Sequence, residues 1–437
     1  MSAVKELLNP IEPGKVRMYV CGITPYDYSH VGHGRSAVSF DFVYRLLKFL
    51  GYNVTYCRNF TDIDDKLINR AQREFGDGLK YHEVAKKFMK AYHEDMHQLH
   101  CVAPTYEPLV TQTIPEIIAF VQGLIDAGKA YWVDGDVYFR IDTALDYGKL
   151  SKQKLDELRA GARVEINDKK EDPLDFALWK GEVEGTFFKS PWGWGRPGWH
   201  IECSAMAAKF LGEHLDIHGG GADLIFPHHE NEIAQSEGLF GEPFVRYWLH
   251  NAFVRINKEK MSKSLGNFFT LRDVFQQVHP TLLRFYFLNH HYRSPLDFAF
   301  EDIESLHKSY QRLCRAFERV QATPMTSAEF EKVSVGKKIM EFVLDDFNTV
   351  GMWGVIFEVL SDLEKDTYQA GALKYLLQEV LGLPLQMLPE KTVEITPEIA
   401  HLLQEREEAR AAKDWKKADK IRDQLLALGV SVQDKKS

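Results

Sequence analysis

Residues 15–60 of the chain read KVRMYVCGI TPYDYSHVGHGR SAVSFDFVYRLLKFLGY NVTYCRNF. The first and last blocks are rich in β-branched and aromatic residues, which predicts two buried strands. The block at residues 36–52 has apolar residues at helical spacing and predicts a helix that stops at Gly51. The block at residues 24–35 is dense in Pro, Asp, Ser and Gly and predicts a loop. A strand–helix–strand unit of this kind predicts an α/β fold with a parallel sheet that binds ligands at the carboxyl ends of its strands.

Several polar residues follow these two strands. Cys21 lies near the end of the first strand, the loop His30-Val31-Gly32-His33 comes after it, and Thr61 follows the second strand. We expect these residues to be neighbours at one edge of the sheet. Gly32 permits close approach of the backbone, and the free N–H groups at the start of a helix favour a phosphate. His30 and His33 can stabilise charge that develops at phosphorus, although a turn with incidental histidines fits the same four letters.

A second polar stretch, residues 198–235, reads GWHIECSAMAAKFLGEHLDIHGGGADLIFPHHENEIAQ. His228 and Glu232 are four residues apart in a segment with a helical pattern, so their side chains share one face. His229 is three residues from Glu232 and competes with His228 for the same role. With Cys203 upstream, the stretch offers a thiolate, an imidazole and a carboxylate, which are ordinary zinc ligands. Polar residues that line a core helix are the alternative.

Two further groups of charged residues have a chemical and a structural explanation. Lys260 and Lys263 lie in the polar loop NKEKMSKSLGNFF and can hold a phosphate chain, but lysine pairs are also common in solvated loops. Asp62, Asp64 and Asp65 can bind magnesium or cap the helix predicted at about residues 64–75. Their place directly before that helix favours capping.

Length and composition limit the class of protein. A chain of 437 residues with 45% hydrophobic and 27% charged residues predicts a globular protein with two or more cores. No apolar run approaches the roughly 18 residues of a membrane span, and no secretory signal is visible. Five scattered cysteines predict a reducing compartment, hence a cytoplasmic protein. The net charge of −9 means that a nucleic-acid partner must bind local basic patches.

The motifs in this order resemble those of the cysteinyl-tRNA synthetase family, within the class I aminoacyl-tRNA synthetases. The resemblance extends over nearly the whole chain. It rests on the segments MYVCGITPYDYSHVGHGR, RNFTDIDDK, GARV, RPGWHIECSAM, DIHGGGADLIFPHHENEIAQ and KMSKSLGNFF.

The resemblance implies an α/β fold with a Rossmann-like catalytic domain. Its halves are residues 1–104 and 191–250. The sequence pattern itself predicts that residues 105–190 are an insertion between these halves, with a helix at 114–127 and a hairpin around Asp134-Gly135. Residues 251–300 are the KMSKS loop and stem-contact region, 301–390 a helical bundle, and 391–437 a small anticodon-binding region that we expect to end in one long helix. Members of the family usually continue past this point with a Gly-Thr-Thr-Trp-Arg-like ending, whereas this sequence stops at DKKS. A truncated sequence and a naturally different tail both fit this departure, and it leaves the anticodon contacts from that end open.

The resemblance also implies the reaction, which is ATP-dependent ligation of L-cysteine to the 3′ end of tRNA(Cys) through cysteinyl-adenylate. One Zn²⁺ per chain selects the substrate thiolate over the hydroxyl of serine, without an editing site. Mg²⁺ accompanies ATP. The implied roles belong to three sets of residues: zinc ligands Cys21, Cys203, His228 and Glu232; amino-acid pocket residues Thr61, Trp199, His218 and Asp223; and ATP-site residues His30, Gly32, His33, Lys260 and Lys263.

The nearest alternative is a cysteine:amino-sugar ligase, which shares this catalytic core but lacks the full anticodon-reading end. The final segment here resembles that of the synthetases and has basic residues that can meet tRNA phosphates, although a solvated helix face is the default for such charges. Those residues are Arg406, Arg410, Lys413, Lys416 and Lys417. A nucleotidyltransferase using HVGH alone leaves the zinc ligands unexplained, and intact motifs argue against an inactive RNA-binding relative. The family also implies a monomer.

Overall fold

The structure is a computed structural model that describes residues 4–155, 157–158, 168–256, 259–260, 268–389, 397–412 and 414–427. The chain divides into two compact units, Met1–Gln386 and Met387–Ser437.

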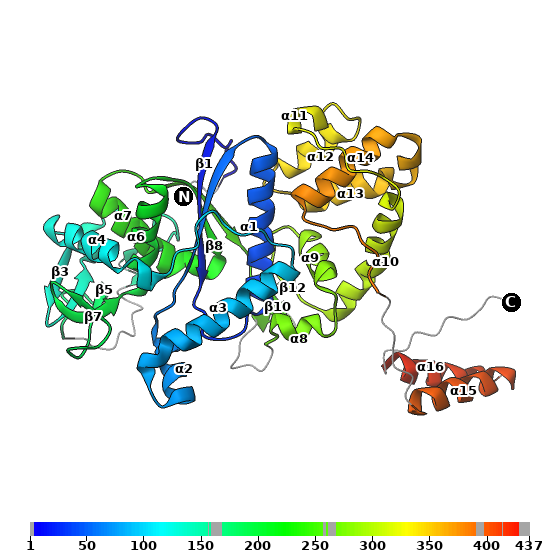
Figure 1. Cartoon of the computed structure of the whole chain (residues 1–437), viewed down its shortest axis with the longest axis horizontal. Coiled ribbons are helices and arrows are strands. Elements are labelled where there is room, and N and C mark those ends of the chain that lie inside the picture. The colour runs from blue at the N-terminus through cyan, green and yellow to red at the C-terminus, as the bar shows by residue number, and fades with distance from the viewer. Residues whose placement is uncertain are drawn as a thin grey trace. The chain divides into compact units, whose positions relative to one another are not determined.

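A four-stranded parallel sheet is the centre of the first unit, in the order β2-β1-β8-β9 (Figure 1). Its strands are β1 (Lys15–Ile23), β2 (Asn53–Phe60), β8 (Leu215–Gly221) and β9 (Val245–Asn251). Because all pairs are parallel, the four carboxyl ends lie at one edge of the sheet. This confirms the predicted sheet and places the two strand-end loops together, with the Thr61 N–H donating to the Ile23 carbonyl over 3.0 Å.

Alternation along β1 assigns its side chains to two different cores. Val16, Met18 and Val20 pack with Phe40 and Leu47 of α1 (Val31–Phe49), whereas Tyr19 and Cys21 face the core formed with α6 (Trp199–Leu211). In Figure 1, α1 lies on one side of the sheet and α6 on the other. Each fully buried large apolar side chain contributes about 1.5–3 kcal/mol relative to an exposed one. The strand period therefore turns Cys21 toward the helix that carries Cys203.

The first helix begins earlier than the sequence pattern predicts. The predicted loop was residues 24–35, but α1 starts at Val31, so Gly32, His33 and Arg35 are helical. His30 has an extended backbone, and its Nδ1 accepts a hydrogen bond from the His33 N–H over 3.2 Å. The reciprocal bond from the His30 N–H to His33 Nδ1 completes a capping box. Histidine is an unusual N-cap, which is why the ordinary start signals missed it.

Helices and a second sheet fill the region between β2 and β8. The helices are α2 (Asp65–Phe75), α3 (Tyr81–Gln98) and α4 (Ile114–Asp126). The antiparallel sheet is ordered β3-β4-β5-β7-β6. Its strands are β3 (Ala130–Val133), β4 (Asp136–Phe139), β5 (Phe176–Gly181), β6 (Phe188–Ser190) and β7 (Gly193–Pro197). The hairpin predicted around Asp134-Gly135 is confirmed, and β7 extends this sheet beyond residue 190.

The three aspartates after β2 have separate partners. Asp64 caps α2 through a 2.8 Å bond from the Lys66 N–H, as predicted. The Asp62 carboxylate accepts from the backbone and hydroxyl of Thr111, and Asp65 pairs with Lys180 and Arg196. They therefore support the local fold.

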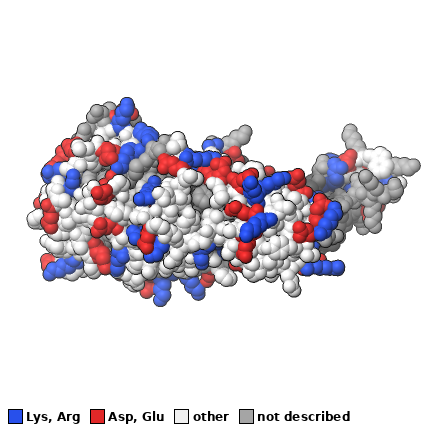
Figure 2. All heavy atoms as spheres, turned by 90° about the horizontal axis from the view of Figure 1, so that it is seen from above, with Lys and Arg blue, Asp and Glu red and all other residues white. Residues whose placement is uncertain are grey.

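The surface mixes both signs of charge. Figure 2 shows Lys and Arg interspersed with Asp and Glu on the face seen there. Within the described residues, no helix combines the length and apolar character needed to cross a membrane.

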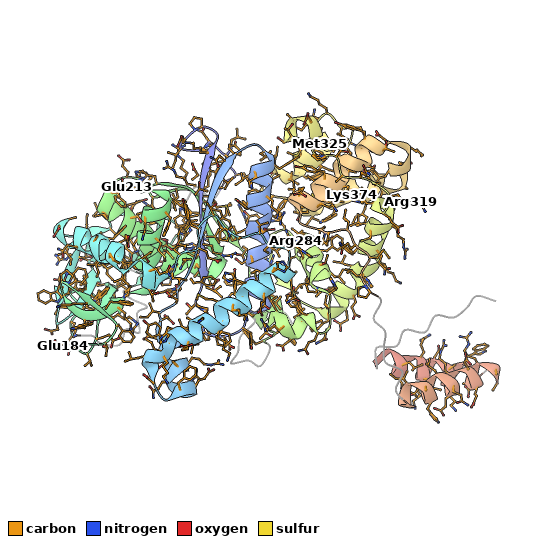
Figure 3. All side chains as sticks on the ribbon, in the orientation of Figure 1. Glu184, Glu213, Arg284, Arg319, Met325 and Lys374 are labelled. Atoms are coloured by element: carbon orange, nitrogen blue, oxygen red, sulfur yellow. The ribbon has the colours of Figure 1, made fainter. Side chains whose placement is uncertain are left out.

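Helices dominate after β9. Short strands β10 (Val254–Ile256), β11 (Glu259–Lys260) and β12 (Leu296–Asp297) form a small sheet. The helices are α8 (Leu271–Phe275), α9 (Pro280–Leu288), α10 (Phe300–Phe317), α11 (Ser327–Phe330), α12 (Gly336–Val343), α13 (Thr349–Val359) and α14 (Thr367–Tyr375). Arg284 of α9, labelled in Figure 3, is fully buried. It pairs with Asp41 of α1 at 2.5 Å and donates to the carbonyls of Leu99 and Leu381, so it joins the helices to the sheet layer.

The second unit contains two helices where one was predicted. They are α15 (Pro397–Ala411) and α16 (Trp415–Ala427), with a small core that includes Ile399 and Leu425. The prediction of one helix was wrong because Asp414 starts a new one, accepting a 3.0 Å bond from the Lys417 N–H. Arg406 is buried, so it is not a surface cation, and Lys417 lies 3.6 Å from Glu405.

Candidate active site

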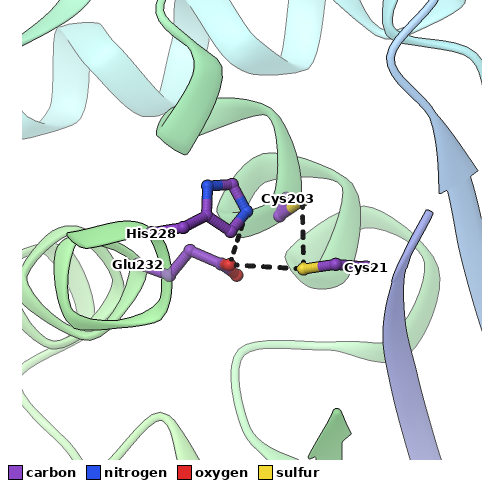
Figure 4. A group of neighbouring side chains, drawn as sticks. All are labelled: Cys21, Cys203, His228 and Glu232. Atoms are coloured by element: carbon purple, nitrogen blue, oxygen red, sulfur yellow. Dashed lines mark hydrogen bonds and ion pairs between the residues drawn. The ribbon is translucent and has the colours of Figure 1, made fainter. Parts of the chain in front are cut away.

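Four predicted zinc ligands from three separate segments meet at the carboxyl edge of the sheet (Figure 4). Cys21 comes from β1, Cys203 from α6, His228 from the turn Ile225–His229, and Glu232 from α7 (Glu230–Phe240). One ligand atom from each lies within 4.8 Å of all the others.

The donor set fits zinc in its chemistry and in its spacing. The two sulfur atoms are 3.8 Å apart, and His228 Nε2 is 3.0 Å from Glu232 Oε1. Two thiolates bound to one tetrahedral zinc at about 2.3 Å are themselves about 3.8 Å apart. Cys203, His228 and Glu232 are buried, and such a group of ionisable side chains is costly without a counter-ion.

Each ligand on the α7 side is held by another histidine. His228 Nδ1 lies 3.0 Å from His200 Nδ1, and His218 Nε2 lies 2.8 Å from Glu232 Oε2. Burial, together with the charge of His228, lowers the pKa of His200 to about 3, so His200 is neutral and its Nδ1 accepts a hydrogen bond from the Nδ1–H of His228. That tautomer presents the Nε2 lone pair of His228 to the cluster.

The electrostatics of the cluster favour a thiolate at Cys203 and a protonated thiol at Cys21. A hydrogen bond from Cys21 lowers the pKa of Cys203 to about 6, although burial opposes the shift. Burial raises the pKa of Cys21 well above its usual range. Burial lowers the pKa of His228, but the Glu232 carboxylate overcomes that effect and raises it to about 10. A cation at the cluster favours the deprotonated form of all four ligands.

A second, overlapping set of ligand atoms contains His229. Cys21, His218, His229 and Glu232 also lie within 4.8 Å of one another, and His229 Nε2 is 3.4 Å from Cys21 Sγ. The competition between His228 and His229 that the sequence left open is therefore present in the structure.

A hydrogen-bonded chain connects the two cysteine segments. The Gly22 N–H donates to Asn59 Oδ1 over 2.9 Å, and Asn59 Nδ2 donates to Thr61 Oγ1 over 3.4 Å. The Thr61 hydroxyl donates to Glu202 Oε2 over 2.8 Å, and burial raises the pKa of Glu202. A Cβ at Gly22 would lie 1.5 Å from the Asn59 carbonyl oxygen, so glycine is required for this approach.

The residues predicted for the amino-acid pocket lie at different depths. The Trp199 ring is 4.3 Å from that of His228 and the residue is 42% exposed, so it lies where the cluster meets the exterior. Asp223 is exposed after β8. His218 is fully buried, and its Nε2 contacts Glu232 Oε2, the oxygen that does not face His228.

The two histidines of the HVGH segment are arranged as hydrogen-bond donors. Their rings stack at 3.6 Å at the N-terminus of α1. Because each Nδ1 accepts a backbone N–H in the capping box, the neutral form of each ring carries its proton on Nε2. The start of α1 therefore combines two Nε2–H donors with the positive end of the helix dipole.

The predicted lysine loop is described only at its flanks. Lys263 lies outside the described residues, and Lys260 is described only by its backbone in β11. After the loop, the Leu271 N–H donates to the Ser29 carbonyl over 2.7 Å, and Phe268 contacts the His30 ring. Before it, the Ala252 and Phe253 carbonyls accept from the Arg35 guanidinium. Both flanks are thus fastened beside the first turn of α1.

Four residues of this site were missed by sequence reasoning: Asn59, His200, Glu202 and His250. His250 Nε2 lies 2.8 Å from His229 Nδ1. The strand period places Asn59 on the same face as Thr61, a signal that was available. The others depend on contacts between distant segments.

Comparison with known proteins agrees with this site. Residues 7–308 match the family described as tRNA synthetases class I (C) catalytic domain, and residues 392–437 match the cysteinyl-tRNA ligase anticodon binding domain. The cysteine–tRNA ligase of Geobacter sp. (strain M21) is 46% identical over 99% of this chain and 96% of its own length. That of Geobacillus thermodenitrificans (strain NG80-2) is 48% identical, over 98% and 95%.

Solved structures show the same fold at low identity. Mycobacterium tuberculosis methionyl-tRNA synthetase in complex with methionyl-adenylate gives a TM-score of 0.55 at 14% identity, covering 85% of this chain and 88% of its own. A leucyl-tRNA synthetase from Agrobacterium radiobacter K84 gives 0.59 at 12%, covering 86% and 85%. The match to an anticodon-binding domain favours a tRNA ligase over the amino-sugar ligase alternative. The sequence matches and the fold together place the chain in the cysteine–tRNA ligase family of class I aminoacyl-tRNA synthetases.

Proposed function

We propose that this enzyme charges tRNA(Cys) with L-cysteine in two steps, through cysteinyl-adenylate, and selects cysteine by its thiolate. The observation that carries this proposal is the convergence of two cysteines, a histidine and a glutamate on the sheet edge at which α1 presents His30 and His33.

Cys21, Cys203, His228 and Glu232 are the residues that hold one zinc per chain. Bound there, zinc supplies a coordination position for a thiolate that a serine hydroxyl does not fill as well. His200 and His218 hold His228 and Glu232 in the orientation that the ligand role requires. The exposed edge of Trp199 marks the side from which the amino acid enters.

The polar groups around the cluster orient the rest of the substrate. The Thr61 hydroxyl donates a hydrogen bond to Glu202 and accepts one from Asn59, so its second lone pair accepts from the substrate ammonium group. Asp223, exposed at the end of β8, is a second partner for that ammonium group. His218 contributes to the pocket by fixing Glu232.

In the first step, the cysteine carboxylate attacks the α-phosphorus of ATP and pyrophosphate leaves. His30 and His33 donate from Nε2 to the oxygens on which charge develops, and Gly32 lets the phosphate approach the helix start. Lys260 and Lys263, with Mg²⁺, hold the departing pyrophosphate. In the second step, a hydroxyl of the terminal ribose of tRNA attacks the carbonyl carbon of the mixed anhydride, and AMP leaves. We propose that the enzyme works as a monomer.

The test is an assay of the two steps with two amino acids and two acceptors. We expect cysteine-dependent exchange of pyrophosphate into ATP, little exchange with serine, and transfer of cysteine to tRNA(Cys). Transfer only to an amino sugar would refute the assignment of the acceptor.

The metal is tested separately by elemental analysis. We expect one zinc per chain and at least a tenfold weaker affinity, roughly, in Cys203→Ser. A metal-free protein that still discriminates cysteine from serine would contradict the selection mechanism.

A further inference from the structure

The turn at residues 147–151 of the insertion, YGKLS, lies on the start of α7, the helix that carries Glu232. Its main contact is with Glu230, which is 1% exposed. The Leu150 N–H donates to Glu230 Oε1 over 3.3 Å, and the Ser151 N–H donates to Glu230 Oε2 over 2.8 Å. One buried carboxylate therefore binds two consecutive backbone N–H groups.

Three more contacts fasten the same turn, two of them to α7 and one to Phe226 in the turn that precedes it. The Tyr147 hydroxyl donates to Asn231 Oδ1 over 2.5 Å, and its ring contacts Phe226. Two turns further along α7, Lys149 pairs with Glu237. We call residues 147–151 the strap.

The strap is a closed turn. The Lys152 N–H donates to the Gly148 carbonyl over 2.8 Å, and Gly148 has a φ of +94°. A Cβ there would lie 1.8 Å from the Gln153 carbonyl oxygen, so the turn depends on glycine. The two N–H groups are thus presented to Glu230 by a preformed structure.

The rotation of α7 about its axis determines the position of Glu232. A side chain tip lies about 5–6 Å from a helix axis, so a rotation of about 10° moves it by about 1 Å. Metal–ligand distances tolerate only about 0.2 Å. Glu230, two residues before Glu232 and two after His228, is placed to prevent such a rotation.

We propose that the strap, through its hydrogen bonds to Glu230, holds α7 in the rotation at which His228 and Glu232 meet Cys21 and Cys203. Glu230 is then a positioning residue for the metal, and the insertion takes part in cysteine selection. The inference rests on the proposed zinc site.

A contact that only stabilises the fold can be distinguished from one that positions the metal ligands, because its loss changes stability but not zinc binding. The Lys149–Glu237 pair joins the same two elements but lies away from the ligands, so its loss should reduce stability without changing the metal. Glu237→Gln is therefore the matched control for Glu230→Gln. Glutamine at position 230 keeps one acceptor and turns an N–H₂ group toward a backbone N–H donor.

The experiment measures zinc affinity of the full chain by competition with a chelator, the absorption spectrum of the cobalt-substituted protein, and thermal stability. We expect Glu230→Gln to weaken zinc binding about 10-fold or more and to change the cobalt spectrum. Glu237→Gln should bind zinc within about twofold of the parent protein. If Glu230→Gln does not fold, Tyr147→Phe removes one strap contact and should weaken zinc binding in the same direction.

Each result decides the question. Equal losses of stability in the two glutamine variants, with unchanged zinc affinity and an unchanged cobalt spectrum, would overturn the positioning role. A parent protein that binds no zinc would instead refute the proposed metal site, so the two failures are distinguishable.

Discussion

Glu232 is shared by both candidate ligand sets, and its two oxygens face different histidines. Oε1 lies beside His228, and Oε2 lies beside His218. Since both sets also share Cys21, one ion can take only one of them. The set with His228 contains both cysteines, and zinc prefers thiolates to further imidazoles. His229 Nδ1 also has a hydrogen-bond partner in His250 Nε2, so we propose His228 rather than His229 as the metal ligand.

This assignment predicts different effects for two adjacent histidines. His228→Gln should weaken zinc binding at least about 10-fold, because it removes a ligand. His229→Gln should retain the metal, since it removes a neighbour of Cys21 that is not a ligand. Chelator competition measures both affinities, and a larger loss in His229→Gln would assign the metal to the other set.

His100, two residues after the end of α3, should make the free energy of unfolding depend on pH. Its Nε2 lies 2.9 Å from Thr281 Oγ1, and burial, with the nearby Arg284 charge, lowers its pKa from 6.5 to about 4. The unfolded chain therefore binds more protons than the folded protein between these two values. The free energy of unfolding should consequently fall as the pH is lowered from about 6.5 toward 4.

Replacing His100 should reduce the loss in the free energy of unfolding that occurs as the pH is lowered. We expect His100→Gln to lose less stability than the parent between about pH 7 and pH 5, measured by urea denaturation. His82→Gln is the control, because the His82 side chain is 63% exposed. Equal losses in all three proteins would show that His100 does not contribute.

At the scale of elements, Arg35 of α1 joins the HVGH turn to the strands that flank the lysine loop. Arg35 is 1% exposed, and its guanidinium donates to five backbone carbonyls. Those carbonyls belong to Ala252, Phe253, His291, Tyr292 and Ser294. Arg35 therefore sets the distance between α1 and the base of β10.

Arg35→Met should slow the activation of cysteine with ATP without removing the metal. We expect the rate of cysteine-dependent pyrophosphate exchange to fall at least about 10-fold, or about 1.4 kcal/mol in the activation barrier. Arg45→Met is a suitable control on the same helix, because Arg45 contacts Asp41, His100 and Glu379 instead. Equal rates in the two variants would contradict this role for Arg35.

At the scale of the whole molecule, the chemistry and the C-terminal unit occupy separate parts of the chain. All four proposed metal ligands and both HVGH histidines belong to Met1–Gln386. The anticodon-binding match lies in residues 392–437, where α15 and α16 have their own small core. The two steps of the reaction should therefore respond differently to loss of this unit.

Removal of residues 390–437 tests this separation. We expect pyrophosphate exchange to remain within about twofold, while kcat/KM for charging tRNA(Cys) falls at least about 10-fold. Kinetic assays of both steps on the same preparation provide the measurement. Loss of exchange as severe as the loss of charging would show that the units are not independent.

Local patterns were enough to predict much of this architecture. Residues close together in the sequence were enough to predict three features. These are the strands that precede the Cys21 and Thr61 loops, the hairpin at Asp134-Gly135 and the cap at Asp64. The start of α1 was misplaced because His30 caps it through a side chain that is rarely a cap. The break before α16 was missed because mixed charges continue through Asp414.

The sequence by itself indicated most of the elements, the candidate ligands and the family, because periodicity and motifs report local burial and chemistry. Only the tertiary structure brought Cys21, Cys203 and Glu232 within reach of one ion. It also placed His200 behind His228 and the strap on Glu230. These positions depend on how β1, α6 and α7 pack around a common core, and that packing joins residues far apart in the chain.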